Sequence, residues 1–244
     1  MIIYKVLVGN YPIIVNENYF DSRIKYYYFH THDIKNKSGP WKFIKIPLEH
    51  SLIYTQRKYK ILSHKLFKEP SFYMDYNFVA NQDIFEKLDF ILSKFNFSAG
   101  SHYFRKTYLD EAIDWLFNCA NEREIIKITR YLKFIKYDFN FHFCMYAGFL
   151  IRYNCAEINN MWWFFWKKFK KRDQLFLPPA SYFSKIKINL FNTEYLTTNK
   201  GNRLDKIFEY KNGYKDIYKL TKKVNEITNR KDKVNIQILK NRAV

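Results

Sequence analysis

Cysteine is scarce in this sequence, and its placement excludes two kinds of site. The chain has three cysteines, Cys119, Cys144 and Cys155, and none of them stands in a CxxC pair. An odd and scattered set supplies neither a disulfide framework nor the paired ligands of a structural zinc site, and the histidines are equally dispersed. We therefore expect reduced thiols and a cytoplasmic location.

Long hydrophobic runs are also missing. The richest apolar run covers residues 161–166, and five basic residues stand among the next six. A transmembrane helix needs about 18 consecutive apolar residues. The apolar segment at residues 2–8 ends at the turn formed by residues 9–12, which makes it too short for a secretory signal. We expect neither a membrane span nor a signal peptide.

Positive charge, by contrast, is abundant. The chain has 42 lysine and arginine residues against 23 acidic residues, for a formal net charge of +19. Residues 191–244 contribute 13 basic and 6 acidic side chains, so the surplus is spread over the chain and not confined to one tail. Such a field attracts anions, which include nucleotides, phospholipid head groups and nucleic acid.

Apolar runs alternate with amphipathic segments along the first 190 residues. We expect strands at residues 2–8, 25–29, 41–46, 71–74, 95–99 and 147–152. Helices are expected at residues 52–66, 81–94, 106–119 and 122–136, with two more that begin near residues 154 and 173. Thr107 and Asp110 have the spacing of a capping box. Strands that alternate with helices predict an α/β fold with a mainly parallel sheet flanked by helices.

Turn-forming residues beyond residue 190 predict a domain boundary. We expect a body at residues 1–190 and a basic, partly helical C-terminal extension at residues 191–244. Apolar residues recur in the extension at helical spacing among lysines, at Ile217, Leu220, Val224 and Ile227. This pattern fits either a helix docked on the body or an amphipathic segment that rests on an anionic membrane.

A carboxylate follows the buried strand expected at residues 71–74. Asp75 comes directly after that strand, and Asn77 supplies a second oxygen two positions later. Mg²⁺ and Mn²⁺ prefer hard oxygen ligands and take much of their coordination from phosphates and water. We predict a divalent-metal site at Asp75 and Asn77 that grips a diphosphate. The alternative is that Asp75 is a turn-former or a helix cap.

Further candidates follow from the rule that ligands of open α/β sheets bind at the carboxyl ends of strands. The residues that follow the first two expected strands are Gly9, Asn10, Tyr11 and Asp33. On the helix at residues 52–66, Arg57 and Lys60 share one face and could hold a diphosphate, Arg57 through its planar fork. The alternatives are ordinary turn residues and a solvated helix face.

Two later segments combine basic and acidic groups. His102 and Arg105 precede an expected helix and are candidates for phosphate contact, His102 also for metal ligation. Glu111 is either a first-turn acid that suits the helix dipole or a catalytic candidate. Asp173 and Gln174 follow a basic run, where Asp173 could be a helix cap. Beside a sugar, the carboxylate would accept hydrogen bonds and the amide would both donate and accept.

Short motifs recur in a fixed order along the chain. They are residues 4–11, 29–33, Trp41 and Lys42, 57–64, 73–75, 102–105, Tyr108, Glu111 and Ala112, 146–148, 152–154, Trp162 and Trp163, and 172–175. In order and spacing these motifs resemble the glycosyltransferase-like domain family that includes plant turgor-regulation and seed-mucilage proteins and many bacterial members. The resemblance covers roughly residues 1–185.

The resemblance implies a GT-A type fold, in which a Rossmann-like nucleotide-binding half is merged with an acceptor-binding half. It places Asp75 at the metal-binding Asp-x-Asp position of the family, where this chain has Asn77 in place of the second acid. Asp173 and Gln174 are also similar to the Asp-Gln pair of the retaining family that includes glycogenin and bacterial lipopolysaccharide galactosyltransferases. In that family the pair lies beside the donor sugar.

The resulting hypothesis is a glycosyltransferase that moves a sugar from a nucleotide-sugar donor to a glycan or lipid-linked acceptor in surface polysaccharide synthesis, for example of a capsule. Mn²⁺ or Mg²⁺ is the expected cofactor. Asp173, Gln174 and Glu111 are the catalytic candidates, with Asp173 or Glu111 as the base if the enzyme inverts. The basic extension would suit contact with the inner, anionic face of the membrane. The alternatives are a nucleic-acid-binding module, although no motif of that kind is present, and a catalytically silent scaffold.

Overall fold

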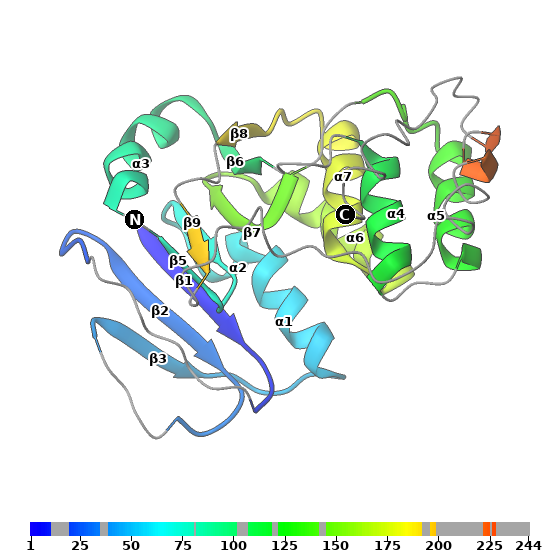
Figure 1. Ribbon diagram of the computed structural model, residues 1–244. Coiled ribbons are helices and arrows are strands. Elements are labelled where there is room, and N and C mark those ends of the chain that lie inside the picture. The colour runs from blue at the N-terminus through cyan, green and yellow to red at the C-terminus, as the bar shows by residue number, and fades with distance from the viewer. Residues whose placement is uncertain are drawn as a thin grey trace, which may run out of the picture.

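A seven-stranded sheet with helices on both faces forms the body of the protein (Figure 1). The computed structural model describes residues 1–10, 20–34, 39–80, 82–101, 107–118, 122–141, 145–191, 196–198, 222–224 and 226–227. Within these residues the predicted α/β class is confirmed, with a mixed sheet in which most strand pairs are parallel and which is flanked by helices.

The large sheet is mixed in direction. Its strands lie in the order β3 (Trp41–Lys45), β2 (Lys25–His30), β1 (Ile2–Leu7), β4 (Ser71–Met74), β7 (Met145–Arg152), β6 (Phe97–Ser101) and β8 (Asn189–Phe191). The first four are parallel to one another, whereas β7 is antiparallel to both β4 and β6. A separate ribbon pairs β5 (Phe78–Ala80) with β9 (Leu196–Thr198). Strand direction therefore reverses between β4 and β7.

Side-chain alternation along β1 divides the core into two layers. Tyr4 and Val6 belong to one hydrophobic cluster, and Ile3 and Leu7 belong to the other, as the two-residue period of a strand requires. Helix α3 (Gln82–Lys94) covers the face of Ile3 and Leu7 with its buried apolar side chains. Both faces of β1 are thus covered, which explains its nearly continuous apolar sequence.

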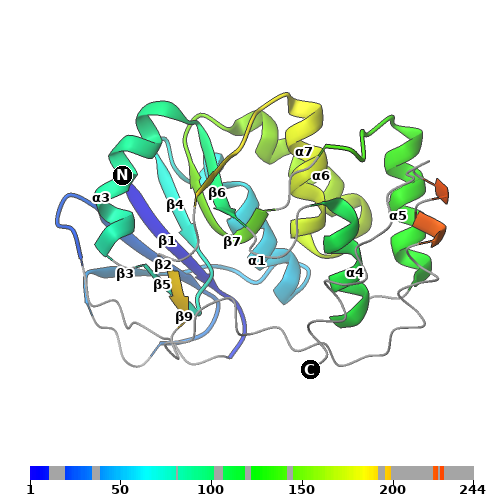
Figure 2. The same cartoon turned by 45° about the horizontal axis from the view of Figure 1, so that its top comes forward.

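The hydrophobic cluster that contains Tyr4 and Val6 includes buried side chains from most of the other helices. They are α1 (Leu52–Ile61), α4 (Tyr108–Asn118), α5 (Glu122–Phe134), α6 (Ala156–Phe169), the 3₁₀ helix η1 (Asp173–Phe176) and α7 (Leu177–Ser184), while the short helix α2 (Ser63–Leu66) contributes none. Helices α4, α5, α6 and α7 stand together at the end of the molecule opposite α3, as both views show (Figures 1 and 2).

One helix boundary agrees with the prediction from the sequence, and another differs from it. Thr107 and Asp110 form the predicted capping box: Asp110 N donates to Thr107 Oγ1 at 3.2 Å, and Thr107 N donates to Asp110 Oδ2 at 2.9 Å. The single helix predicted at residues 52–66 is wrong, because the backbone leaves helical geometry at Leu62 (φ −89°, ψ 39°) and separates α1 from α2.

A buried arginine fixes the C-terminal end of α1. Arg152 on β7 is 1% exposed and donates to the carbonyl oxygens of Lys60 at 2.7 Å and Ile61 at 3.2 Å. It also donates to the hydroxyl of Tyr4 at 2.5 Å. The last carbonyl groups of a helix have no partner within the helix, so Arg152 satisfies them and holds the backbone of Lys60 against the sheet.

The described parts of the predicted C-terminal extension contact the body. Strand β9 pairs with β5, Val224 is buried in the same cluster as Tyr4, and Lys223 forms an ion pair with Glu122 of α5. These contacts favour docking for this part of the extension, while the division at residue 190 stays a prediction. None of the described helices is long and apolar enough to cross a membrane.

Candidate functional site

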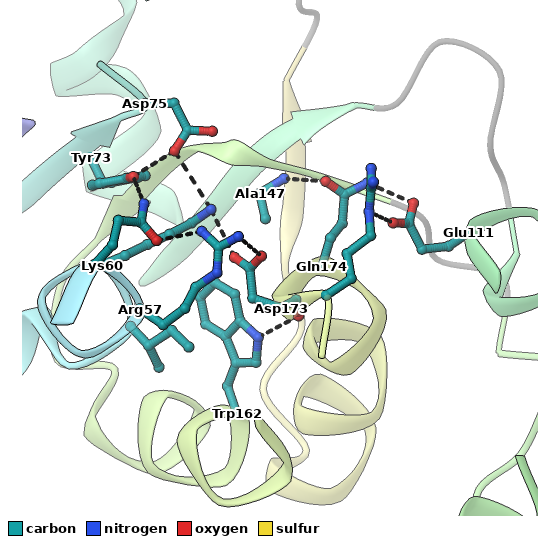
Figure 3. A network of polar contacts seen from close by, with 12 residues as sticks. Arg57, Lys60, Tyr73, Asp75, Glu111, Ala147, Trp162, Asp173 and Gln174 are labelled. Carbon is teal, nitrogen blue, oxygen red and sulfur yellow. Dashed lines mark hydrogen bonds and ion pairs between the residues drawn. The ribbon is translucent and has the colours of Figure 1, made fainter. Parts of the chain in front are cut away.

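Four charged side chains meet where β4 ends (Figure 3). Arg57 and Lys60 come from α1, Asp75 follows β4, and Asp173 opens η1. The Asp173 carboxylate lies 3.0 Å from Arg57 (Nη2 to Oδ1) and 2.8 Å from Lys60 (Nζ to Oδ2). Lys60 Nζ also lies 3.7 Å from Asp75 Oδ1. One face of α1 therefore presents two cations to two carboxylates from other elements.

Two neutral side chains close these contacts into a ring. Tyr73 donates its hydroxyl proton to Asp75 Oδ1 at 2.5 Å and accepts a hydrogen bond from Gln56 Nε2 at 2.9 Å. Gln56 Oε1 in turn accepts from Arg57 Nη1. We call the six side chains that are joined in this way the charge ring: Arg57, Gln56, Tyr73, Asp75, Lys60 and Asp173.

Burial makes pairing within the charge ring necessary. The side chains of Lys60 and Asp173 are 3% and 5% exposed, whereas those of Arg57 and Asp75 are each 26% exposed. A charge removed from water is stable only when it is paired. Burial alone would raise the pKa of Asp173, but Arg57 and Lys60 outweigh that effect and lower it to about 2.

The Tyr73 hydroxyl is a permanent donor in the charge ring. Burial, with the Asp75 carboxylate beside it, raises the pKa of Tyr73 well above its ordinary value. The hydroxyl therefore keeps its proton at any physiological pH. Its hydrogen bond fixes Asp75 Oδ1 in place and does not involve the second carboxylate oxygen, Oδ2.

The reversal of strand direction brings the start of β7 alongside Asp75. The Asp75 backbone N–H donates to the Gly148 carbonyl oxygen at 2.9 Å. A Cβ atom at position 148 would lie 2.9 Å from Asp75 Oδ2 and would clash with the ring of Tyr146. Any side chain at position 148 would therefore have to displace the Tyr146 ring and the Asp75 carboxylate from these positions.

Gln174 and Glu111 form a second cluster beside the charge ring (Figure 3). Gln174 Oε1 accepts from the backbone N–H of Ala147 at 3.2 Å, and Gln174 Nε2 donates to Glu111 Oε2 at 2.7 Å. Arg172 Nε lies 2.5 Å from Glu111 Oε1. The neighbouring residues Asp173 and Gln174 thus point to different sides of η1, Asp173 toward α1 and Gln174 toward α4.

Asp75 is the side chain in this region that suits a divalent metal. Its Oδ1 is engaged by Tyr73 and Lys60, so Oδ2 is the atom available to an ion. In the part of the chain that the structure describes, no three histidine, cysteine or acidic side chains gather closely enough to hold a metal. The described residues thus form no dedicated protein cage, and an Mg²⁺ or Mn²⁺ ion at Asp75 would need most of its ligands from phosphates and water. Asn77, half-buried in the turn between β4 and β5, stays a prediction as a second ligand.

The other predicted binding residues follow β1 and β2 at the same edge of the sheet. Gly9 has a φ of 101° and donates its N–H to Thr31 Oγ1 at 3.2 Å, which joins the ends of the two strands. Asn10 is exposed, as is Asp33, which pairs with Lys45 at 2.8 Å. Three further candidates lie outside the described residues: Tyr11, His102 and Arg105.

Sequence reasoning gave no role to six residues that hold the candidates in place, although all of them except Gln56 stand in the motifs that carry the resemblance: Gln56, Tyr73, Ala147, Gly148, Trp162 and Arg172. Two of them also carried a local signal. Tyr73 stands two positions before Asp75, on the same side of an extended chain, and Gln56 stands four positions before Lys60, on the same helix face. Trp162 carried none, because its indole N–H donates to the Asp173 carbonyl oxygen from a different helix, at 2.7 Å.

Comparison with known proteins gives similarity at the level of solved structures. No family model and no curated protein matches the chain. A structure of an active-site mutant of LgtC is 12% identical, with a TM-score of 0.45, over 79% of this chain and 73% of the other. A structure of the galactosyltransferase LgtC in complex with donor and acceptor sugar analogues is 12% identical, with a TM-score of 0.43, over 97% and 99% of the two chains. Scores this low carry no argument about family or function.

Asp173→Asn should remove stability that the unmodified protein has near neutral pH and loses in acid. The pKa of Asp173 is about 2 in the folded protein, against an ordinary value of 3.8. A carboxyl group with a depressed folded-state pKa contributes stability above the unfolded pKa and loses it as pH falls toward the folded value. The shift corresponds to about 2 kcal/mol. In urea unfolding, the difference in the free energy of unfolding between the two proteins should shrink as the pH falls from about 6 to about 2.5. A constant gap would contradict the ion pairs of Asp173.

Tyr73→Phe should destabilise the protein more than Tyr108→Phe, its matched control. Both tyrosines are buried, but the Tyr108 hydroxyl hydrogen-bonds to the neutral Thr129 Oγ1, and Thr129 keeps its own bond to the Ile125 carbonyl. Loss of the Tyr73 hydroxyl removes a partner from a carboxylate and from an amide, which costs about 2 kcal/mol against about 1 kcal/mol for the control. Equal losses in urea unfolding would show that the Tyr73 hydroxyl does not support the charge ring.

Proposed function

We propose that this chain is a glycosyltransferase that uses a nucleotide-sugar donor. The charge ring carries the proposal, because it places two cations and a partly exposed carboxylate at the carboxyl end of β4. Ligands of open α/β sheets bind beyond the carboxyl ends of strands, where the topology reverses. Arginine, lysine and a metal-binding carboxylate are the groups that a diphosphate and its metal require.

In this proposal Arg57 and Lys60 neutralise the departing nucleoside diphosphate. Sugar transfer passes through an oxocarbenium-like transition state, so the enzyme must mainly stabilise the charge that develops on the leaving group. Arg57 offers a planar fork for two phosphate oxygens, and Lys60 offers a point charge. Because Asp173 already holds both cations in place, they need little reorganisation when the donor binds.

The charge balance of the ring supports a divalent metal as cofactor. The charge ring carries two positive and two negative side chains, so a bound diphosphate would leave an excess of negative charge. Mg²⁺ or Mn²⁺ would supply the missing positive charge and act as a Lewis acid on the diphosphate. Asp75 would hold it through Oδ2, with Asn77 as the second candidate ligand, while Tyr73 keeps the Asp75 carboxylate in one orientation.

Asp173 and Gln174 are proposed to orient the donor sugar. A carboxyl group with a pKa of about 2 is a weak base at neutral pH, so Asp173 suits an electrostatic role better than removal of a proton from an acceptor hydroxyl. This supports transfer with retention of configuration, as the sequence resemblance implies. Gln174 has one N–H and one lone pair beyond its contacts with Glu111 and Ala147 to offer to the sugar.

The proposed acceptor is a glycan or a lipid-linked sugar, and the proposed product is a surface polysaccharide such as a capsule. We propose that the protein acts in the cytoplasm, in peripheral contact with the inner face of the membrane, since its net charge of +19 favours an anionic leaflet. A nucleic-acid-binding module would use the same positive charge. That alternative gives the two carboxylates of the charge ring no part in binding, because nucleic acid is itself an anion.

A thermal-shift screen of nucleoside diphosphates and sugar nucleotides, with and without Mn²⁺, tests the proposal at the level of binding. A ligand at a hundred times its dissociation constant adds about 2.7 kcal/mol of stability, which gives a readily measured rise in melting temperature. We expect the rise to depend on Mn²⁺. Salt-sensitive binding of random oligonucleotides, with no rise for any nucleoside diphosphate, would favour the nucleic-acid alternative.

Donor hydrolysis or transfer then tests catalysis. Asp75→Ala should lower Mn²⁺-dependent turnover by at least about tenfold, because the metal loses its protein ligand. Asp89→Ala is the matched control, since Asp89 on α3 is 86% exposed, and its turnover should be unchanged. Full turnover in a folded Asp75→Ala variant would reject the metal assignment. Donor binding without turnover in the unmodified protein would instead indicate a catalytically silent scaffold.

A further inference from the structure

Glu111 is a carboxylate with no room for a reacting partner. It lies on α4, is 1% exposed, and has both oxygens occupied. Oε1 lies 2.5 Å from Arg172 Nε, and Oε2 accepts the hydrogen bond from Gln174 Nε2 at 2.7 Å. A general base must come within hydrogen-bond distance of the proton that it removes. The contacts of Glu111 therefore argue against its role as the base of an inverting reaction.

The same contacts select one orientation of the Gln174 amide. A glutamine side chain can flip and so exchange its nitrogen and oxygen. Here Oε1 faces the Ala147 N–H, which can only donate, and Nε2 faces the Glu111 carboxylate, which can only accept when ionised. Two partners of opposite kind thus require the same orientation. The N–H and the lone pair that remain on Gln174 then have fixed directions.

We infer that Glu111 is a positioning residue, which acts on the reaction through the amide of Gln174 and does not touch the donor. The effect on turnover rests on the proposed function, in which Gln174 orients the donor sugar. Arg172 completes the arrangement, because it holds the second oxygen of Glu111 and immobilises the carboxylate that Gln174 contacts. Glu111 and Arg172 together tie α4 to the residues of η1.

Glu111→Gln tests this inference with little change of shape. In the unmodified protein one carboxylate oxygen pairs with the Arg172 guanidinium and the other accepts from Gln174 Nε2, whereas an amide has a single acceptor oxygen. The positively charged guanidinium should take that oxygen, because charge-assisted hydrogen bonds are the stronger ones. The new NH₂ group would then face the NH₂ group of Gln174. Gln174 must move away or flip, and a flip breaks its bond with Ala147.

Side-chain amide resonances of ¹⁵N-labelled protein measure this contact without any assay of activity. The Gln174 pair is identified by its loss in Gln174→Ala. We expect one Gln174 amide proton to exchange slowly in the unmodified protein and at least tenfold faster in Glu111→Gln. The matched control is Glu124→Gln on α5, which removes an ion pair with Lys171 in the same segment and should leave the Gln174 signal unmoved. An unmoved signal in Glu111→Gln would overturn the inference.

Kinetics separate a positioning residue from a base. Glu111→Gln should lower kcat by about tenfold to a hundredfold with little change in the donor KM, as a misplaced contact group does. The double variant with Gln174→Ala should be no slower than Gln174→Ala alone, because both changes remove the same function. The acidic limb of the pH profile should persist in Glu111→Gln. Loss of that limb, or additive effects in the double variant, would overturn the inference and restore Glu111 as a base.

The amide measurement and the kinetic measurement together keep this inference distinct from the proposed function. No turnover in the unmodified protein would contradict the proposed transferase, while the amide signal still decides whether Glu111 holds Gln174. If Glu111→Gln does not fold, Glu111→Asp is the variant to measure, because it keeps the charge and shortens the side chain by one methylene. It should accelerate the same amide exchange, and an unmoved signal there would also overturn the inference.

Discussion

Two cations that share one buried carboxylate hold the candidate site of this protein together. Arg57 and Lys60 both contact Asp173, and removal of one partner from a buried ion pair costs several kcal/mol because the other charge is left unpaired. Hydrogen bonds from other elements to the backbone of these residues hold the charged groups in place. Arg152 holds the end of α1 through the Lys60 carbonyl, and Trp162 holds η1 through the Asp173 carbonyl. The electrostatics of the site therefore depend on helix packing as much as on the charged residues themselves.

Local patterns in the sequence were sufficient for most of the longer elements and for part of the site. Apolar runs of strand length gave β1, β2, β3 and β4, and the Thr107 capping box marked the start of α4. Asp75 could be placed at the exit of β4 because a buried strand that ends in an acid is a local signal. Arg57 and Lys60 could be placed on one helix face because their spacing matches a helical turn.

Contacts between distant segments could not be predicted in this way. Nothing near Asp173 indicates that its carboxylate meets α1, and nothing near Gln174 indicates that its amide is held between β7 and α4. The short strands β5, β8 and β9 were missed because three residues give too little alternation to recognise. The break at Leu62 was missed because its cause, the packing of α1 and Arg152 on the sheet, lies outside the helix sequence.

A crystal structure with a bound nucleoside diphosphate and Mn²⁺ would test the role of the charge ring most directly. We expect diphosphate oxygens within hydrogen-bond distance of Arg57 and Lys60, and anomalous scattering from Mn²⁺ beside Oδ2 of Asp75. A diphosphate that binds away from β4, with the ion pairs of Asp173 unchanged and no metal at Asp75, would contradict that role.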